Sequence, residues 1–194
     1  MKNSLLINDT EIVSKLIKGC QQGDQDAFHH LFLAYKDRVH SLALHFSNDE
    51  NMVSDITQTV FLKLFVNIKE FRFESDFNTW LYRIIVNECI QQQKKQNRFL
   101  PFILEKMSKL IYKDSHETKL MRKQATNEVQ AVIAGLDVKL RIPVMLKYIE
   151  GLSYEEIAEI VGCSKGTISS RLNRAHRVLA HKLAHLEIIL GELQ

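Results

Sequence analysis

Apolar residues recur at three- and four-residue steps along most of the chain, and two-residue alternation is rare. This period is that of amphipathic helices, and it predicts an all-α protein. A first helix is expected from about Thr10 to Cys20, before a break at Gly23. Asp24 is suited to cap a second helix. That helix carries an apolar stripe typical of a core face, formed by Phe28, Leu31, Phe32, Tyr35, Val39, Leu42 and Phe46.

Two further helices are expected in the N-terminal half. A polar turn at residues 48–51 precedes the third, whose apolar side consists of Val53, Ile56, Val60, Phe61, Leu64 and Phe65. Residues 71–78 are predicted to be a loop that holds three aromatic residues among charged and small polar ones. Thr79 is expected to cap the fourth helix. This helix runs through Ile90 and continues into a polar, basic segment that ends at Arg98.

The helical period weakens from Phe99 to about Thr126, where Pro101 interrupts an apolar patch at residues 99–104. We interpret residues 99–126 as a flexible linker that joins two small helical domains, 1–98 and 127–194. The second domain opens with helical periodicity in Val129, Val132, Ile133 and Leu136. A further helix is expected to begin near Pro143, because proline is tolerated in a first turn, and to end at Gly151.

Residues 153–182 have the pattern of a helix-turn-helix. Ser153 and Glu156 have capping-box spacing. Gly162 is suited to a left-handed helix end, and Ser164 can cap the next helix. A turn of about three residues fixes such helices at a steep angle. The apolar side of the first helix is Tyr154, Ile157, Ile160 and Val161, and that of the second is Ile168, Leu172, Ala175, Leu179 and Leu183.

The polar side of the second helix carries residue types that bind DNA. No acidic residue occurs between Glu159 and Glu187. Arg, Asn and Thr side chains read base edges, whereas basic side chains on phosphates position the helix. The predicted base-reading residues are Thr167, Ser170, Asn173, Arg174 and Arg177, and the predicted phosphate contacts are Lys165 and Arg171. A solvated basic face on an ordinary helical hairpin is the alternative interpretation.

The composition of the chain limits the classes of protein to which it can belong. The net charge of +3 is too small to identify a nucleic-acid binder by itself. The 7 glycines and 2 prolines are few, which favours helices over turn-rich β architectures. Three cysteines lie far apart without metal-ligand spacing, as expected of free thiols in a reducing cytoplasm. No signal peptide is recognisable, and no apolar run approaches the ~20 residues that span a bilayer. A cytoplasmic protein is therefore expected.

An enzyme is disfavoured. His181 and His185 have the spacing of a metal-binding pair, but no third ligand accompanies them. The chain has no glycine-rich phosphate loop, nucleophile elbow or paired-carboxylate motif. We therefore expect no catalytic residues, no metal and no cofactor.

Residues 144–179, VMLKYIEGLSYEEIAEIVGCSKGTISSRLNRAHRVL, resemble the promoter-reading C-terminal domain of bacterial sigma factors of the sigma-70 family. The compact extracytoplasmic-function (ECF) class is the most similar. The N-terminal half resembles the same class at residues 24–44, in DITQTVFLKLF from Asp55 and in FRFESDFNTWLYRIIVNECI from Phe71. The similarity covers about residues 10–98 and 127–186. The chain departs from the family pattern at Thr59, at Asp137 and at residues 91–93.

The resemblance implies an alternative sigma factor that binds the RNA polymerase core, recognises promoter DNA and initiates transcription. It implies that Asp55 and Gln58 face the clamp helices of the largest subunit, that the flap is a second contact, and that an anti-sigma factor is a partner. The C-terminal domain would recognise the −35 element, and the N-terminal domain would recognise and melt the −10 element. The DNA-binding residues implied there, including the basic run, are Trp80, Arg83, Asn87, Lys94, Lys95 and Arg98.

The aromatic loop at residues 71–78 would form part of a pocket for a base held out of the stack. Core packing is the alternative role for Trp80. A conventional helix-turn-helix regulator that binds duplex DNA without forming holoenzyme also stays open, although it gives residues 71–98 no role. A helical adaptor that binds only protein predicts that DNA affinity is insensitive to salt.

Overall fold

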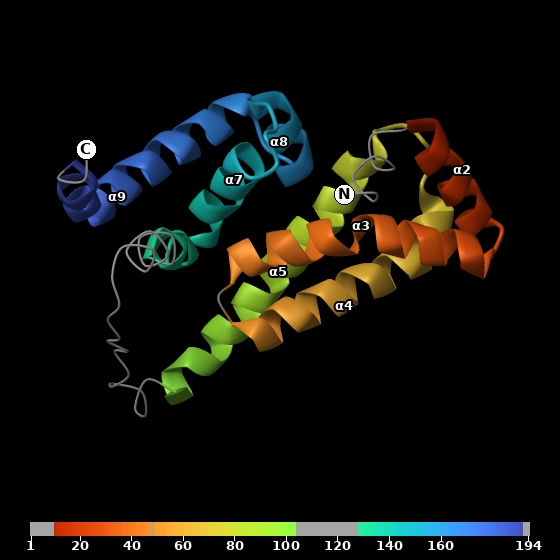
Figure 1. Cartoon of the computed structure of the whole chain (residues 1–194), viewed down its shortest axis with the longest axis horizontal. Coiled ribbons are helices and arrows are strands. Elements are labelled where there is room, and N and C mark those ends of the chain that lie inside the picture. Colours follow the sequence, from red (N-terminus) through yellow and green to blue (C-terminus); the bar gives the residue numbers. More distant parts are fainter. Residues whose placement is uncertain (1–9, 48, 104–127, 192–194) are drawn as a thin grey trace. The chain divides into compact units, whose positions relative to one another are not determined.

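The computed structural model describes residues 10–47, 49–103 and 128–191, and every regular element within them is helical (Figure 1). The prediction of an all-α protein is therefore confirmed for these parts of the chain. The chain divides into two compact units, Met1–Cys89 and Ile90–Gln194. Most of the expected linker, residues 104–126, lies outside the described residues.

The first unit is built from helices that follow one another through short connections. They are α2 (Thr10–Gln21), α3 (Gln25–Phe46), α4 (Glu50–Asn67), the short 3-10 helix η1 (Ile68–Glu70) and the beginning of α5 (Phe77–Ile103). α3 packs against both α2 and α4, beside which it lies in Figure 1. The rings of Tyr35 and Phe77 lie 5.3 Å apart and join α3 to the start of α5.

Local polar contacts fix where α3 and α4 begin. Gly23 has a φ of +87°, a left-handed conformation that glycine adopts without strain. The Asp24 carboxylate then accepts hydrogen bonds from two backbone N–H groups of α3, which confirms the predicted cap. Asp49 caps α4 in the same way. For this reason α4 begins at Glu50, inside the stretch 48–51 that was expected to be a turn.

The predicted cap of α5 is wrong. α5 begins at Phe77, two residues before Thr79. Asp76 supplies the contacts instead: its Oδ1 accepts the N–H of Asn78 at 2.8 Å, and its carbonyl accepts the N–H of Trp80 at 3.1 Å. Aspartate is a somewhat better N-cap than threonine, and here it precedes the first aromatic residue of the helix.

The far end of α5 also differs from the expectation. The helix continues past Pro101 to Ile103, beyond the start of the expected linker at Phe99. The side chains of the apolar patch 99–104 lie outside the described residues.

The apolar stripe predicted on α3 lies in the core. Its fully buried members are Leu31, Tyr35, Val39, Leu42 and Phe46. Phe32 packs edge-on against Phe61 of α4, with ring centroids 4.7 Å apart. Phe65 departs from its predicted place on the buried side of α4, because 57% of its surface is exposed. Its ring contacts Phe28 at 4.9 Å and leaves the outer side uncovered.

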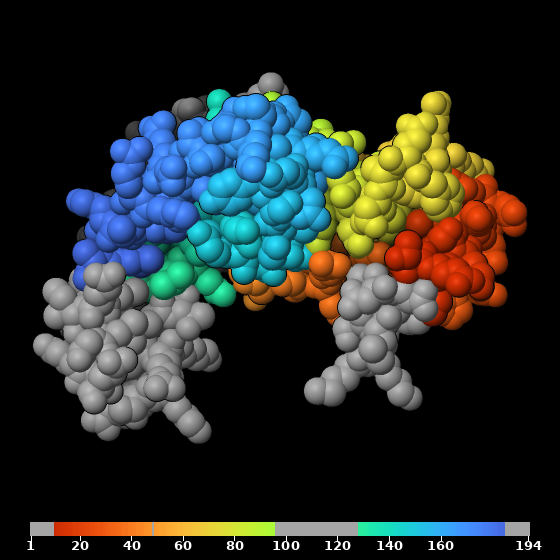
Figure 2. All heavy atoms as spheres, turned by 90° about the horizontal axis from the view of Figure 1, so that it is seen from above, coloured from red at the N-terminus to blue at the C-terminus, as the bar shows by residue number. Residues whose placement is uncertain are grey.

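The second unit contains a helical segment at residues 128–134, followed by α7 (Val138–Tyr148), α8 (Tyr154–Val161) and α9 (Lys165–Gly191). α9 packs against α7 and α8, and α7 also contacts α8. In the space-filling view, α8 and the start of α9 adjoin on the surface of this unit (Figure 2).

The prediction that α7 begins near Pro143 is wrong, because the helix begins at Val138. The Asp137 side chain accepts the N–H of Lys139 at 2.8 Å, and this cap fixes the start of the helix. Asp137 thus has a capping role at the position where the chain departs from the family pattern. Pro143 lies buried inside α7, where it removes one helical hydrogen bond.

Candidate nucleic-acid interface

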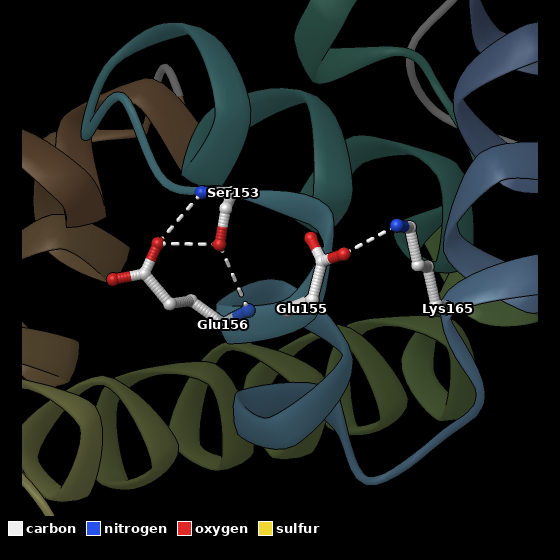
Figure 3. Close-up of polar contacts among 4 residues, drawn as sticks. All are labelled: Ser153, Glu155, Glu156 and Lys165. Atoms are coloured by element: carbon white, nitrogen blue, oxygen red, sulfur yellow. Dashed lines mark hydrogen bonds and ion pairs between the residues drawn. The ribbon is translucent and has the colours of Figure 1, made fainter.

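Reciprocal hydrogen bonds fix the start of α8. The backbone N–H of Glu156 donates to the Ser153 hydroxyl at 3.2 Å. The Glu156 carboxylate accepts the Ser153 N–H at 2.8 Å and its hydroxyl at 2.6 Å (Figure 3). The predicted capping box is therefore confirmed. The hydrogen bonds from the Ser153 hydroxyl and then its N–H lower the pKa of Glu156, so this carboxylate stays charged to a lower pH than an ordinary glutamate does.

A turn of three residues joins α8 to α9. Gly162 has a φ of +70°, the predicted left-handed conformation, and its N–H donates to the carbonyl of Ala158 at 2.9 Å. Ser164 caps α9, since its hydroxyl accepts the N–H of Thr167 at 3.1 Å. These contacts confirm the helix-turn-helix and fix the angle between its two helices.

The two sides of α9 differ in burial. Ile168, Leu172 and Ala175 are buried on the side that packs within the unit, and Leu179 and Leu183 are half-buried. Four of the predicted base-reading residues are exposed on the other side: Ser170, Asn173, Arg174 and Arg177. The helix therefore presents a polar and basic outer face on an apolar support.

Two predicted DNA-binding residues of α9 are half-buried and have partners within the unit. The hydroxyl of Thr167 lies 2.9 Å from the Ser164 hydroxyl, so this group takes part in the cap of α9. Nη1 of Arg171 lies 4.0 Å from the sulfur of Cys163 in the turn. The hydroxyl of Ser170 donates to the Thr167 carbonyl at 2.9 Å.

A groove of about 570 Å³ lies between the start of α7 and the outer face of α9. Its lining residues are Asp137, Lys139, Leu140, Ser170, Arg171, Arg174 and Arg177. Four cationic side chains therefore border one groove, an arrangement suited to DNA phosphates beside the base edges. Sequence reasoning missed Lys139, because only the packing of α7 on α9 brings it there.

Lys165, the first residue of α9, forms an ion pair with Glu155 of α8 (Figure 3). Both side chains are 62% exposed. No acidic residue lies between Glu159 and Glu187, but the preceding helix α8 contributes the Glu155 carboxylate to the beginning of α9.

In the first unit, aromatic rings gather at the loop before α5. The ring centroid of Phe71 lies 4.9 Å from that of Phe73, 5.6 Å from Phe77 and 5.3 Å from Trp80. Phe71 and Phe77 are buried, Phe73 is exposed, and Trp80 is half-buried. Trp80 therefore packs on core rings and keeps surface on which a base could stack.

A cavity of about 200 Å³ lies beside this loop. It is lined by Thr10, Val13, Ser14, Ile17, Tyr35, Phe71, Phe73, Ser75, Asp76, Phe77 and Asn78. The Tyr35 hydroxyl and Oδ1 of Asn78 are buried and have no hydrogen-bond partner among the described residues. Burial raises the pKa of Tyr35 to about 12, so the hydroxyl keeps its proton. Unpaired buried polar atoms are rare, and these two offer a donor and an acceptor to a planar polar group.

The remaining predicted residues of α5 follow one helical side. Trp80, Arg83 and Asn87 are separated by three and four residues, with Arg83 half-buried and Asn87 exposed. Lys94 and Lys95 are exposed further along the helix. The side chain of Arg98 lies outside the described residues.

The predicted polymerase-binding residues lie on α4. Asp55 and Gln58 are exposed one helical turn apart. Further along the same helix, Leu62, Phe65 and Val66 expose more than half of their surface. Exposed apolar side chains that adjoin one another indicate a protein-binding surface. Sequence reasoning missed these three, because the period assigned Phe65 to the core.

Within the described residues, no group of three or more His, Cys, Asp or Glu side chains is placed to hold a metal ion. No described helix is long and apolar enough to cross a membrane.

The fold and its exposed basic helix define a DNA-binding protein of the helix-turn-helix class. Residues 31–99 match sigma-70 region 2, and residues 126–179 match sigma-70 region 4. The chain belongs to the sigma-70 family, as its sequence pattern had indicated. It is an alternative sigma factor of the ECF class, which binds the RNA polymerase core, recognises promoter DNA and initiates transcription.

Relatives extend over nearly the whole chain. The ECF RNA polymerase sigma factor SigW of Bacillus subtilis is 33% identical over 184 residues, which cover 90% of this chain and 98% of that protein. The ECF RNA polymerase sigma-E factor of Haemophilus influenzae is 34% identical and covers 88% of this chain and 95% of its own length. The structure of CnrH in complex with the cytosolic domain of CnrY has the same fold, with a TM-score of 0.64, 24% identity, and coverage of 88% and 96% of the two chains.

Proposed function

We propose that the chain divides promoter recognition between two domains. The domain at residues 1–98 binds the polymerase core and recognises and melts the −10 element. The domain at residues 127–194 reads the −35 element as duplex DNA, and residues 99–126 link the two. The observation that carries this proposal is the exposed basic side of α9, which is supported by an apolar opposite side and fixed by a capped helix-turn-helix.

In the C-terminal domain, α9 enters the major groove. Asn173, Arg174 and Arg177 are exposed and have the side-chain types that bind adenine and guanine edges. Lys139 and Arg171 line the groove beside them, and in this proposal they contact phosphates of the same duplex. Thr167 contributes through the cap that fixes the start of α9.

In the N-terminal domain, the cavity beside residues 71–78 takes one base of the opened strand. The unpaired Tyr35 hydroxyl and Asn78 oxygen supply a donor and an acceptor, and the surrounding rings supply stacking surfaces. Trp80, Arg83 and Asn87 continue the contact along α5. Lys94, Lys95 and Arg98 follow the phosphates of the separated strand.

The polymerase core is bound through the exposed side of α4. Asp55 and Gln58 supply polar contacts to the clamp helices of the largest subunit, and Leu62, Phe65 and Val66 supply apolar area. Thr59, where the chain departs from the family pattern, is half-buried and contributes no charge to this surface. The flap of the polymerase core is a second contact, and the C-terminal domain binds it.

The protein acts in the cytoplasm, where its polymerase is, and it catalyses no reaction of its own. Sigma factors have been solved with proteins that bind them, as in the complex of RpoE with the anti-sigma factor NepR from Bartonella quintana. We infer an anti-sigma factor for this chain as well, which covers the core-binding or DNA-binding surfaces until it is released.

The proposal is tested by reconstitution with RNA polymerase core. The chain should co-elute with core polymerase and direct runoff transcription from promoters selected out of genomic fragments. Phe65→Ser should reduce core binding, whereas Arg174→Ala should leave core binding intact and reduce promoter selection. If the chain binds duplex DNA tightly alone and never forms holoenzyme, it is a conventional regulator and the proposal is wrong.

A further inference from the structure

Gln21, the last residue of α2, binds the backbone of the segment that leads into the aromatic loop at residues 71–78. Its Nε2 donates to the carbonyl of Phe71 at 2.8 Å and to the carbonyl of Ile68 at 3.0 Å. The side-chain amide has two N–H hydrogens, one for each of these carbonyls. η1, which contains Ile68, packs against α2 and lies beside it in Figure 1. One side chain therefore joins the end of α2 to the start of the loop.

Phe71 connects this contact to the cavity beside the loop. Its ring centroid lies within 5.6 Å of those of Phe73, Phe77 and Trp80, and Phe71 itself lines the cavity. It is also buried, so its ring is fixed relative to the core of the first unit. A displacement of the Phe71 backbone would therefore move the ring around which the other three are arranged.

Phe73 shows that the loop is held in a strained conformation. Its φ is +59°, in the left-handed region that a bulky residue enters only at a cost in free energy. Such strain persists only where the surrounding structure fixes it, and it clusters at functional sites. The side chain is 43% exposed, so burial of the ring compensates the strain only in part. The same helix supplies a second contact to the loop, because the Lys18 ammonium lies 5.8 Å from the centroid of the Phe73 ring, one turn before Gln21.

We propose that Gln21 is a positioning residue for promoter opening, which holds the aromatic loop in the conformation that accepts a base of the opened strand. Gln21 acts through the Phe71 and Ile68 carbonyls and makes no contact with DNA. Without its two N–H donors, the loop is free to relax the strained φ of Phe73. The conformation that accepts a base is then populated for a smaller fraction of the time, and the apparent affinity for the opened strand falls by that fraction. This inference rests on the proposed entry of one base into the cavity.

The test uses holoenzyme and promoter DNA whose −10 element is already single-stranded, with each nucleotide of the element in turn replaced by an abasic site. Wild type should bind about tenfold more weakly when one particular base is missing, since stacking of that base is lost. Gln21→Met has a similar length and no donor, and Gln21→Lys keeps donors for the two carbonyls. Gln22→Met and Gln22→Lys are matched controls, because the neighbouring Gln22 is exposed and the same atoms and charges change.

Gln21→Met should bind the intact strand about fivefold more weakly than wild type, as expected from the loss of two hydrogen bonds. On DNA that lacks the sensitive base it should bind as wild type does, because no base then requires the loop. Gln21→Lys and both Gln22 variants should behave as wild type on all DNAs.

Three results would overturn the inference. Gln21→Met may bind the intact strand normally, or it may lose the same factor on intact and abasic DNA, which a general structural defect would cause. Gln21→Lys may show the same loss as Gln21→Met, in which case the donors are not the cause. If wild type has no sensitive position in the element, no base enters the cavity, and the proposed role of the cavity is wrong together with this inference.

Discussion

The ammonium group of Lys63 lies 2.5 Å from the carboxylate of Glu88, a side chain that is only 2% exposed. The pair joins α4 to α5. A buried carboxylate is tolerated only when other groups compensate its charge. The position of the surface proposed to bind polymerase thus depends partly on one ion pair.

Lys63→Met should destabilise the first unit. Removing one partner of a fully buried pair costs about 3–5 kcal/mol, but the Lys63 side chain is 34% exposed, so we expect about 1–3 kcal/mol. Chemical denaturation followed by circular dichroism measures the change. Lys15→Met, which removes the exposed pair with Glu11, is the control and should change stability by less than about 0.5 kcal/mol. Equal effects of the two substitutions would contradict a special role for Lys63.

The helix-turn-helix could be predicted from the sequence because its determinants are local. Ser153, Glu156, Gly162 and Ser164 each act on backbone groups within a few residues, and all four have the predicted conformation or contact. The start of α7 shows the limit of such signals. Pro143 is favourable in a first turn, but the cap from Asp137 set the start five residues earlier.

The parts of the candidate site that sequence reasoning missed depend on contacts between elements. Lys139 joins the basic groove only because α7 packs on α9, and Glu155 meets Lys165 only because the turn brings the helix starts together. Tyr35 lies on an apolar stripe in the sequence, where nothing distinguishes an unpaired buried hydroxyl from a satisfied one. Phe65 has the period of a core residue, yet no described helix covers its outer side.

Tyr35→Phe should have opposite effects on the stability of the first unit and on its function in promoter opening. The buried hydroxyl has no partner among the described residues, so its removal relieves a desolvation penalty and should stabilise the protein by about 1 kcal/mol. The same substitution removes the donor from the cavity and should slow promoter opening. Thermal unfolding and permanganate reactivity of promoter thymines measure the two effects. A variant that is less stable, or that opens the promoter normally, would contradict the proposed role of the cavity.

The capping box of α8 should contribute a pH-dependent stability. The pKa of Glu156 is lowered in the folded protein, so its contribution is fully present above the unfolded-state value near 4.5 and is lost as the pH falls through the folded value. Glu156→Gln keeps an acceptor but cannot titrate. The difference in unfolding free energy between wild type and this variant should shrink between pH 6 and pH 3.

Ser153→Ala provides the control for this prediction. It removes the hydroxyl that is the main cause of the lowered pKa, and it should destabilise the protein by about 1 kcal/mol. In its background, Glu156→Gln should have a much weaker pH dependence. An unchanged pH dependence would assign the effect to another carboxylate.

Arg174→Ala and Lys139→Ala should distinguish base reading from phosphate binding within one groove. Both residues line the groove beside α9, and each substitution removes one positive charge. Arg174→Ala should weaken binding to the selected duplex by about 1–3 kcal/mol and have a smaller effect on a scrambled duplex. Lys139→Ala should weaken both equally and reduce the slope of log K against log salt by about 1. Fluorescence anisotropy over a range of salt concentrations measures both quantities. An equal loss on the two duplexes for Arg174→Ala would show that Arg174 contacts only phosphate, and the base-reading role would then pass to Asn173 and Arg177.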